Sequence, residues 1–140
     1  MEPKIINGGI AVDDRGSLRF VNEFDFAGVK RFYCVENSGP ARQVRAWHGH
    51  KKEGKYVYVA RGSIVVGVVN LDTEQVILRT VLSDASPKVL YIPPNHANGF
   101  MNLTENAIVF FFSTSTLDES RGDDIRFPYD KWNIWAVEPR

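Results

Sequence analysis

The chain has 140 residues, a length that suits one domain with a core of its own. Its 17 basic and 17 acidic side chains cancel, so no net field favours a nucleic acid or an anionic membrane as partner. No apolar run approaches the ~20 residues of a membrane span and no signal peptide opens the chain, so we expect a cytoplasmic protein. The single cysteine, Cys34, lies in an apolar run, and we expect it to be buried and inert.

Short runs of β-branched and aromatic residues follow one another along the chain, and no window of about 12 residues has the apolar spacing of a helix. These runs predict strands. In chain order they are Ser17–Val21, Lys30–Val35, Gln43–His50, Lys55–Ala60, Ser63–Asn70, Gln75–Leu82, Lys88–Ile92, Gly99–Leu103 and Asn106–Ser113. Turn residues such as Asp14-Arg-Gly16 separate the runs. Many short strands at this spacing predict an all-β domain, an antiparallel sandwich or jelly-roll β-barrel.

Two of the predicted strands, at 64–69 and 108–112, are apolar on both faces. A small barrel hides only one face of a strand, so we expect the other face to meet a second sheet or subunit. We predict a homodimer on this ground. The segment 123–135 contains a proline and several aromatic residues, and we expect it to be irregular and to pack on the barrel.

His48 and His50 alternate on one predicted strand, so both side chains leave the same face. Metal-binding cupin barrels carry His-x-His, four residues, Glu, six residues, Gly. Here His50 is followed in the same frame by Lys55 and Gly62, and an ammonium group cannot bind a cation. The position of a third cupin histidine holds Asn98, and an amide is a poor ligand. We therefore predict neither a metal nor another cofactor, and disfavour a metal-dependent cupin oxygenase.

The polar residues of these motifs are expected to meet at one mouth of the barrel. The set is Arg45, His48, His50, Lys55 and Asn98. The two histidines could simply fill the barrel and satisfy each other. Burying this much polarity without a ligand would be costly, however, so we favour a functional site.

These residues resemble the dTDP-4-dehydrorhamnose 3,5-epimerase family, RmlC-like cupin enzymes that act on nucleotide-linked 4-keto sugars. The matching motifs are Asp14-Arg-Gly16, Arg45-Ala-Trp-His48, Gly54-Lys55, Arg61-Gly62 and Tyr91–Phe100. In the family, the motif that contains His48 carries the catalytic histidine. The resemblance implies a single RmlC-like cupin domain, a double-stranded β-helix, over residues 1–140.

A second group of relatives, the sugar 3,4-ketoisomerases, resembles the first half of the chain more closely. Their Arg-Gly-Phe-His-x-His-Lys is similar to residues 45–51, and their Arg-x-Tyr is similar to Arg31-Phe-Tyr33. The epimerases use a late tyrosine as acid, but the corresponding stretch at 110–117 has none. Their carboxylate partner for the histidine lies in a C-terminal extension, whereas this sequence ends at Arg140.

The implied chemistry is proton removal next to a ketone, which needs a base of near-neutral pKa and a donor at the oxyanion. We assign His48 as the base, His50 as a proton shuttle and Lys55 as the oxyanion partner. Tyr33, Tyr58 or Tyr129 could supply the missing acid, and Tyr33 lies in the ketoisomerase-like motif. The result is epimerisation of a 4-keto-6-deoxy sugar in polysaccharide or deoxysugar biosynthesis. A 3,4-keto shift and a non-catalytic sugar-binding cupin are the alternatives.

The diphosphate of such a substrate needs cationic anchors, and guanidinium groups match phosphate oxygens. We expect a nucleotide sugar, most simply a dTDP sugar, to be the partner of this site. The predicted substrate-binding residues are Arg15, Arg45, Arg61, Asn95 and Asn98.

Overall fold

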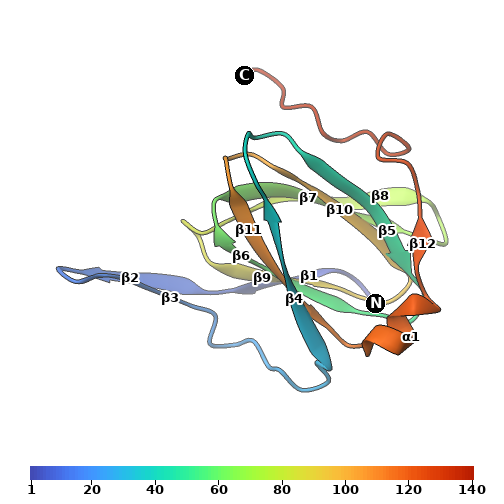
Figure 1. Cartoon of the computed structure of the whole chain (residues 1–140), viewed down its shortest axis with the longest axis horizontal. Coiled ribbons are helices and arrows are strands. Elements are labelled where there is room, and N and C mark those ends of the chain that lie inside the picture. The colour runs from blue at the N-terminus through green and yellow to red at the C-terminus, as the bar shows by residue number, and fades with distance from the viewer.

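The computed structural model describes residues 1–140 and consists of two five-stranded antiparallel sheets that face each other (Figure 1). The first sheet has the order β1 (Lys4–Asn7), β9 (Lys88–Ile92), β6 (Lys55–Arg61), β11 (Ala107–Ser113) and β4 (Arg31–Asn37). The second has the order β12 (Ile125–Arg126), β5 (Val44–His50), β10 (His96–Asn102), β7 (Ser63–Asn70) and β8 (Gln75–Ser83). From β4 to β12 consecutive strands alternate between the two sheets, apart from the β7–β8 hairpin, as in a jelly roll, so the predicted all-β cupin barrel is confirmed.

A separate hairpin of β2 (Gly9–Asp13) and β3 (Gly16–Phe20) projects from this body (Figure 1). The one helix, α1 (Leu117–Arg121), begins at a capping box in which Thr116 and Glu119 bond each other's backbone N–H groups. The sequence did not predict β1, β2, β12 or α1, which have two to five residues each. No helix has the length and apolar character that crossing a membrane requires.

The main core lies between the two sheets and is built from alternate side chains of their strands. Val57 and Val59 of β6, Val66 and Val68 of β7, and Phe111 of β11 are among its members. Each of these side chains has at most 4% of its surface exposed. The inward alternation of the strands therefore produces one continuous apolar layer that fixes how the sheets face each other.

A second apolar cluster lies on the outer face of β7, where the C-terminal segment packs down. Trp135 is buried there against Trp47, with ring centroids 5.2 Å apart, and Val65 and Val69 lie beneath them. The irregular, packed tail predicted from the sequence is thus confirmed. It also means that the second apolar face of β7 is covered by the chain itself rather than by a partner.

The first sheet, in contrast, keeps an outer face that is partly open. Phe32 of β4 is 65% exposed on it and Phe26 is 61% exposed, beside Phe110 and Phe112 of β11. Cys34 also points outward and is exposed, so the expectation of a buried thiol was wrong. The alternation along β4 explains this, since residues 32, 34 and 36 share the outer face while 31, 33 and 35 face inward.

Candidate active site

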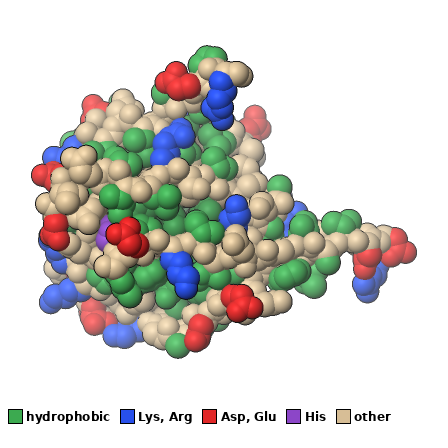
Figure 2. Space-filling view, turned by 180° about the vertical axis from the view of Figure 1, so that it is seen from behind, with side chains coloured by type: hydrophobic (Ala, Val, Ile, Leu, Met, Phe, Trp, Pro, Cys, Tyr) green, Lys and Arg blue, Asp and Glu red, His purple; other side chains and the backbone are tan.

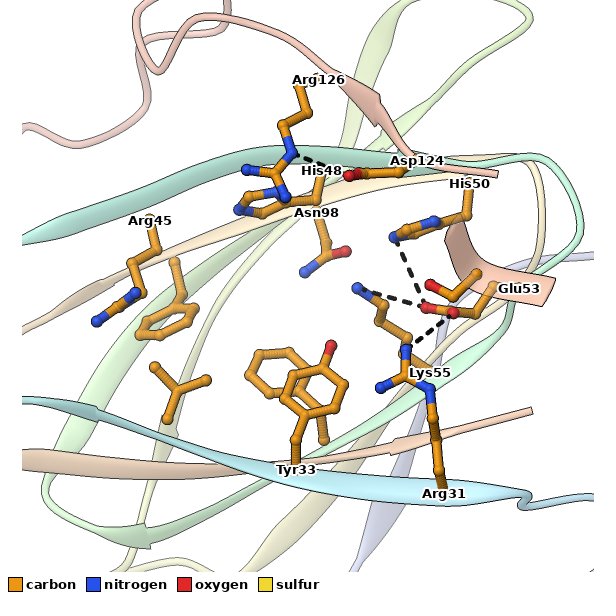
Figure 3. Close-up of a pocket in the computed structure, with 14 residues that line it drawn as sticks. Arg31, Tyr33, Arg45, His48, His50, Glu53, Lys55, Asn98, Asp124 and Arg126 are labelled. Carbon is orange, nitrogen blue, oxygen red and sulfur yellow. Dashed lines mark hydrogen bonds and ion pairs between the residues drawn. The ribbon is translucent and has the colours of Figure 1, made fainter. Parts of the chain in front are cut away.

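A cavity of about 300 Å³ opens between the two sheets and is lined by side chains from both (Figure 3). Its polar lining residues are Arg31 and Tyr33 of β4, Arg45, His48 and His50 of β5, Glu53 of the β5–β6 loop, Lys55 of β6, Asn98 of β10, Ser120 of α1, and Asp124 and Arg126 at β12. The predicted convergence of the motif residues at one mouth of the barrel is therefore observed.

A bulge in β5 brings Arg45 to the same wall as His48, although the two are three residues apart. On β10 the residues paired with them, Phe100 and Asn98, are only two apart, so β5 carries one extra residue. Gly99 faces this bulge, and a Cβ atom there would lie 2.5 Å from that of Ala46. The glycine thus permits the close backbone approach that aims Arg45 into the cavity.

His48 is half-buried, and its ring makes no hydrogen bond within the chain. Burial lowers the pKa of His48 to about 4, and the positive charges of Lys55 and Arg126 add to this effect. The imidazole is therefore neutral at pH 7. A neutral ring with unbonded nitrogens in an open cavity is free to accept a proton.

The carboxylate of Asp124 lines the same cavity as His48. Strand β12 pairs with β5, with Arg126 opposite His48, and Asp124 lines the cavity just before this strand. Arg126 Nε donates to Asp124 Oδ2 over 3.1 Å, and the carboxylate opposes the lowering of the pKa of His48. This carboxylate was not expected from the sequence, because in the resembled family the partner of the histidine lies in a C-terminal extension.

His50 differs from His48 in that both of its ring nitrogens face other groups of the chain. Nδ1 lies 2.6 Å from the carbonyl oxygen of Asp123, and Nε2 lies 3.6 Å from Glu53 Oε2. Because a carbonyl oxygen can only accept, Nδ1 carries the hydrogen. Burial, followed by the charge of Lys55, lowers the pKa of His50. The predicted shuttle role of His50 stays a prediction.

Lys55 extends from the start of β6 into the cavity and is almost fully buried. Its Nζ lies 3.6 Å from Glu53 Oε2, and 5.9 and 5.7 Å from the ring centres of Tyr33 and Phe111. Burial lowers the pKa of Lys55, and the charge of Glu53 opposes this. The ammonium group thus stands between a carboxylate and two aromatic rings.

Tyr33 lies on β4, in the sheet opposite to that of His48, and its ring stacks on Phe111 at 5.1 Å. Burial raises the pKa of Tyr33, and the negative charge of Glu53 adds to this. The phenol therefore keeps its proton across the physiological range and is available as a donor.

Six of the nine predicted site residues line the cavity, and the other three do not. Arg15 is at the tip of the projecting hairpin, where it binds Asp13. Arg61 ends β6, six residues and roughly 20 Å from Lys55. Asn95 forms the turn before β10, with φ at 67°, and accepts a hydrogen bond from Lys51 Nζ.

Four charged lining residues were not among the predictions: Arg31, Glu53, Asp124 and Arg126. Arg31 shares an inward face with Tyr33 two residues later, and Asp124 and Arg126 share one in the same way. This period-two spacing was a signal that could have identified them. Glu53 lies in a loop, where no periodicity applies.

Comparison with known proteins identifies a family and several solved structures with the same fold. A family model described as dTDP-4-dehydrorhamnose 3,5-epimerase matches residues 5–137. The Bacillus anthracis dTDP-4-dehydrorhamnose 3,5-epimerase, with TDP and PPi bound, superposes with a TM-score of 0.78 at 19% identity, covering 99% of this chain and 87% of that one. The Helicobacter canadensis 3,4-ketoisomerase superposes with a TM-score of 0.71 at 22% identity, covering 94% of each chain. QdtA, a sugar 3,4-ketoisomerase from Thermoanaerobacterium thermosaccharolyticum in complex with TDP, superposes with a TM-score of 0.66 at 26% identity. The match covers 91% of this chain and 89% of that one.

No curated protein sequence matches the chain significantly. The barrel nevertheless has the RmlC-like cupin fold of these structures, and the family model places the chain in the isomerase class. Since the family model spans nearly the whole sequence, the chain belongs to the dTDP-4-dehydrorhamnose 3,5-epimerase family. The family and the isomerase class predicted from the motifs are thereby confirmed.

Proposed function

We propose that the chain isomerises a dTDP-linked 4-keto-6-deoxy sugar by removing a proton next to the ketone, without a metal ion. The observation that carries this proposal is the presence, in one cavity, of an imidazole without a hydrogen bond in the chain and a buried lysine side chain, those of His48 and Lys55. Hydrogens beside a carbonyl are weakly acidic, and their removal requires a base together with a cation near the carbonyl oxygen.

In this mechanism a free ring nitrogen of His48 takes the proton from the carbon beside the ketone. The electrons of the broken C–H bond form the enolate, and the Lys55 ammonium stabilises the negative oxygen. The charge of a bound nucleotide diphosphate would offset the positive field of Lys55 and Arg126, which lowers the pKa of His48 in the free protein. Substrate binding would therefore make His48 a stronger base.

Epimerisation further requires an acid on the opposite side of the sugar, and we assign this role to Tyr33. It stands on β4 of the first sheet, whereas His48 stands on β5 of the second. A proton leaving toward His48 and a proton arriving from Tyr33 would invert the carbon between them. Burial keeps the Tyr33 phenol protonated, as an acid must be.

A 3,4-keto shift is the second candidate, because His48 and His50 lie on one wall, two residues apart. Two bases on the same side of a sugar could move a proton between neighbouring carbons. QdtA, at 26% identity, is described as a sugar 3,4-ketoisomerase. For this route Nε2 of His50 would have to turn from Glu53 toward the substrate.

For the substrate's polar groups we propose Arg45 and Asn98, which line the same cavity as His48. Arg45 Nε donates to Asn37 Oδ1 over 2.6 Å, which fixes the stem and leaves the rest of the guanidinium for an anion. A cytoplasmic role in polysaccharide or deoxysugar biosynthesis is part of this proposal.

We also propose a homodimer. The projecting hairpin carries exposed apolar side chains, including Val12 at 74% and Leu18 at 65%. Figure 2 shows an arm with hydrophobic side chains along it and charged side chains at its end. The open aromatic face around Phe32 adds to this surface. Arg15, at the end of the arm, could meet a substrate only in the cavity of a second copy. Light scattering on a size-exclusion column should give twice the monomer mass, and Leu18→Glu should shift it to the monomer mass.

The chemistry can be tested by incubating the protein with a dTDP-4-keto-6-deoxy sugar in deuterated, chelator-treated buffer and following the sugar by NMR. Exchange with inversion at C3, C5 or both supports epimerisation, and a new 3-keto product identifies the keto shift. Binding without exchange at any carbon would contradict the proposal and identify a sugar-binding cupin. Exchange that chelator abolishes and a metal restores would contradict the metal-free mechanism.

A further inference from the structure

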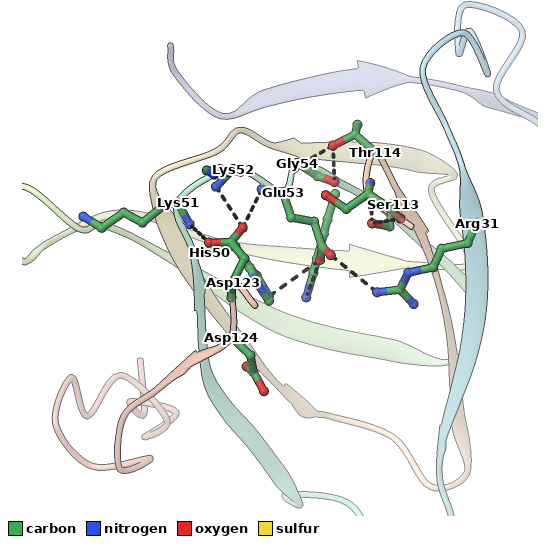
Figure 4. A network of polar contacts seen from close by, with 12 residues as sticks. Arg31, His50, Lys51, Lys52, Glu53, Gly54, Ser113, Thr114, Asp123 and Asp124 are labelled. Carbon is green, nitrogen blue, oxygen red and sulfur yellow. Dashed lines mark hydrogen bonds and ion pairs between the residues drawn. The ribbon is translucent and has the colours of Figure 1, made fainter. Parts of the chain in front are cut away.

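Glu53 is the only acidic side chain of the protein that is fully buried, and it borders the cavity (Figure 3). Figure 4 shows the polar contacts around it. None of its side-chain surface is exposed. A buried carboxylate is costly unless cations or hydrogen-bond donors surround it. The groups around Glu53 therefore indicate what it does.

Three cationic or protonatable groups from three strands surround this carboxylate. Arg31 Nη2 of β4 lies 3.4 Å from Oε1, while His50 Nε2 of β5 and Lys55 Nζ of β6 each lie 3.6 Å from Oε2. The two oxygens are thus shared unequally. Arg31 holds one of them, and the other lies between His50 and Lys55.

The backbone beneath Glu53 is held as firmly as its side chain. The carboxylate of Asp123 accepts hydrogen bonds from the backbone N–H groups of Lys51, Lys52 and Glu53 at 2.7, 2.9 and 3.0 Å. The carbonyl of the same Asp123 accepts from Nδ1 of His50. Asp123, which follows α1, therefore fixes both the loop that carries Glu53 and the side chain of His50.

His50 Nε2 and Glu53 Oε2 have no hydrogen-bond partner in the chain, although they face each other. With the hydrogen on Nδ1, the neutral ring presents a lone pair to a carboxylate lone pair. Oε2 consequently has only one strong donor within reach, and that donor is the Lys55 ammonium.

We propose that Glu53 is a positioning residue for Lys55: it keeps the ammonium charged and aimed at the place where the substrate oxygen becomes negative. Arg31 holds the carboxylate at Oε1 and acts on the reaction through it. This inference deepens the proposed function and rests on it. The cavity wall would attract an anionic substrate more strongly without the Glu53 carboxylate. A role in supporting Lys55 explains why the carboxylate is nevertheless there.

The charges that face Lys55 explain why this support is needed. Burial, then Arg31, would favour loss of the proton from Lys55, and Glu53 is the strongest opposing influence, followed by Asp124. The titratable and charged groups that face Lys55 across the site are Arg31, Tyr33, His48, His50, Glu53 and Asp124. Of these, Glu53 alone combines full burial with a negative charge next to Nζ.

The test is Glu53→Gln, which keeps the shape of the side chain and removes its charge. The basic limb of the kcat profile should move to lower pH, and kcat at pH 8 should fall roughly tenfold, less than the loss of a whole oxyanion donor. Glu53→Asp keeps the charge and should restore the position of the basic limb. Glu74→Gln is the matched control, because its exposed ion pair with Lys131 lies on the surface.

A second measurement does not depend on turnover. In protein labelled with carbon-13 in its lysines, the Lys55 ε-methylene signal, identified by its loss in Lys55→Met, should titrate at lower pH in Glu53→Gln than in the wild type. Unchanged titration of Lys55 in Glu53→Gln would overturn the proposal. If that variant does not fold, a wild-type Lys55 that loses its proton below pH 7 would overturn it equally. An inactive wild type with the expected Lys55 titration would instead refute only the proposed function.

Discussion

The two halves of the cavity differ in how completely the chain satisfies its own polar groups. Around His48 the wall is open, and the ring has no hydrogen bond within the chain. Around His50 the wall is closed, because Asp123 and Glu53 face its two ring nitrogens and Lys55 in turn faces Glu53. Two histidines on one strand thus have different roles available to them. The open half can exchange protons with a ligand, while the closed half keeps charges in fixed positions.

The contrast illustrates how one fold separates reactivity from preorganisation. A base must present a free lone pair, so a protein cannot bond it fully. An oxyanion partner must be charged and immobile before the substrate arrives, so it needs buried support. His48 on β5 meets the first demand, and Lys55 at the start of β6, paired with the buried Glu53, meets the second.

The largest effect should come from the open half. His48→Asn keeps a polar side chain of similar size and removes the base, so kcat should fall about 10²- to 10⁴-fold. Because the ring makes no hydrogen bond within the chain, the urea midpoint of unfolding should change little. Turnover close to that of the wild type would show that another group is the base.

The closed half should respond in the opposite way, with stability affected first. Asp123→Ala leaves three backbone N–H groups without their acceptor, and we expect a loss of about 2–4 kcal/mol in the free energy of unfolding. The fall in kcat should be roughly tenfold, since Glu53 and Lys55 remain but lose their fixed support.

Asp118→Ala in the neighbouring helix serves as the control for Asp123→Ala. Its side chain is 90% exposed, so its removal should change the free energy of unfolding by less than about 0.5 kcal/mol. If the two variants unfold at the same urea concentration, Asp123 does not fix the closed half.

The stability of the protein should fall as the pH drops from 7 toward 4. Burial lowers the folded pKa of His48 to about 4 and also lowers that of His50, so between the unfolded value near 6.5 and this range the unfolded chain binds more protons. After allowance for the exposed part of the ring, His48 should contribute on the order of 1 kcal/mol. The slope of the unfolding free energy against pH should be shallower in His48→Asn. An equal slope would contradict the lowered pKa of His48.

The smallest effect should come from the exposed cation beside His48. Arg126→Gln removes one positive charge that lowers the pKa of His48, so the acid limb of kcat/KM should move to slightly higher pH. Because the Arg126 side chain is 70% exposed, the change at pH 5 should be about twofold. An acid limb at lower pH than that of the wild type would have the wrong sign for this account.

The sequence was sufficient for the parts of the site that depend on strand periodicity. The alternation of His48 and His50 and the frame that leads to Lys55 predicted three cavity residues from one segment. Asn98 followed from its place in the second motif. The bulge that turns Arg45 inward has no signal in the residues themselves, because it depends on Gly99 of the neighbouring strand.

The parts that the sequence could not provide depend on tertiary contacts of loops and segments without a period. Glu53 belongs to the site only because Asp123, seventy residues later, fixes its loop. Arg61 and Asn95 match family motifs, yet they lie at a strand end and in a turn outside the cavity. A motif identifies the segment, but only the register of the strands decides which side chains face the ligand.

The most direct test of the difference between the two histidines is nitrogen-15 NMR of their rings as a function of pH. We expect His48 to stay neutral down to about pH 5 and His50 to carry its hydrogen on Nδ1 while neutral. On addition of a dTDP sugar, the titration of His48 should move to higher pH. A His48 that titrates at or above 6.5 in the free protein, or a His50 with its hydrogen on Nε2, would contradict the account.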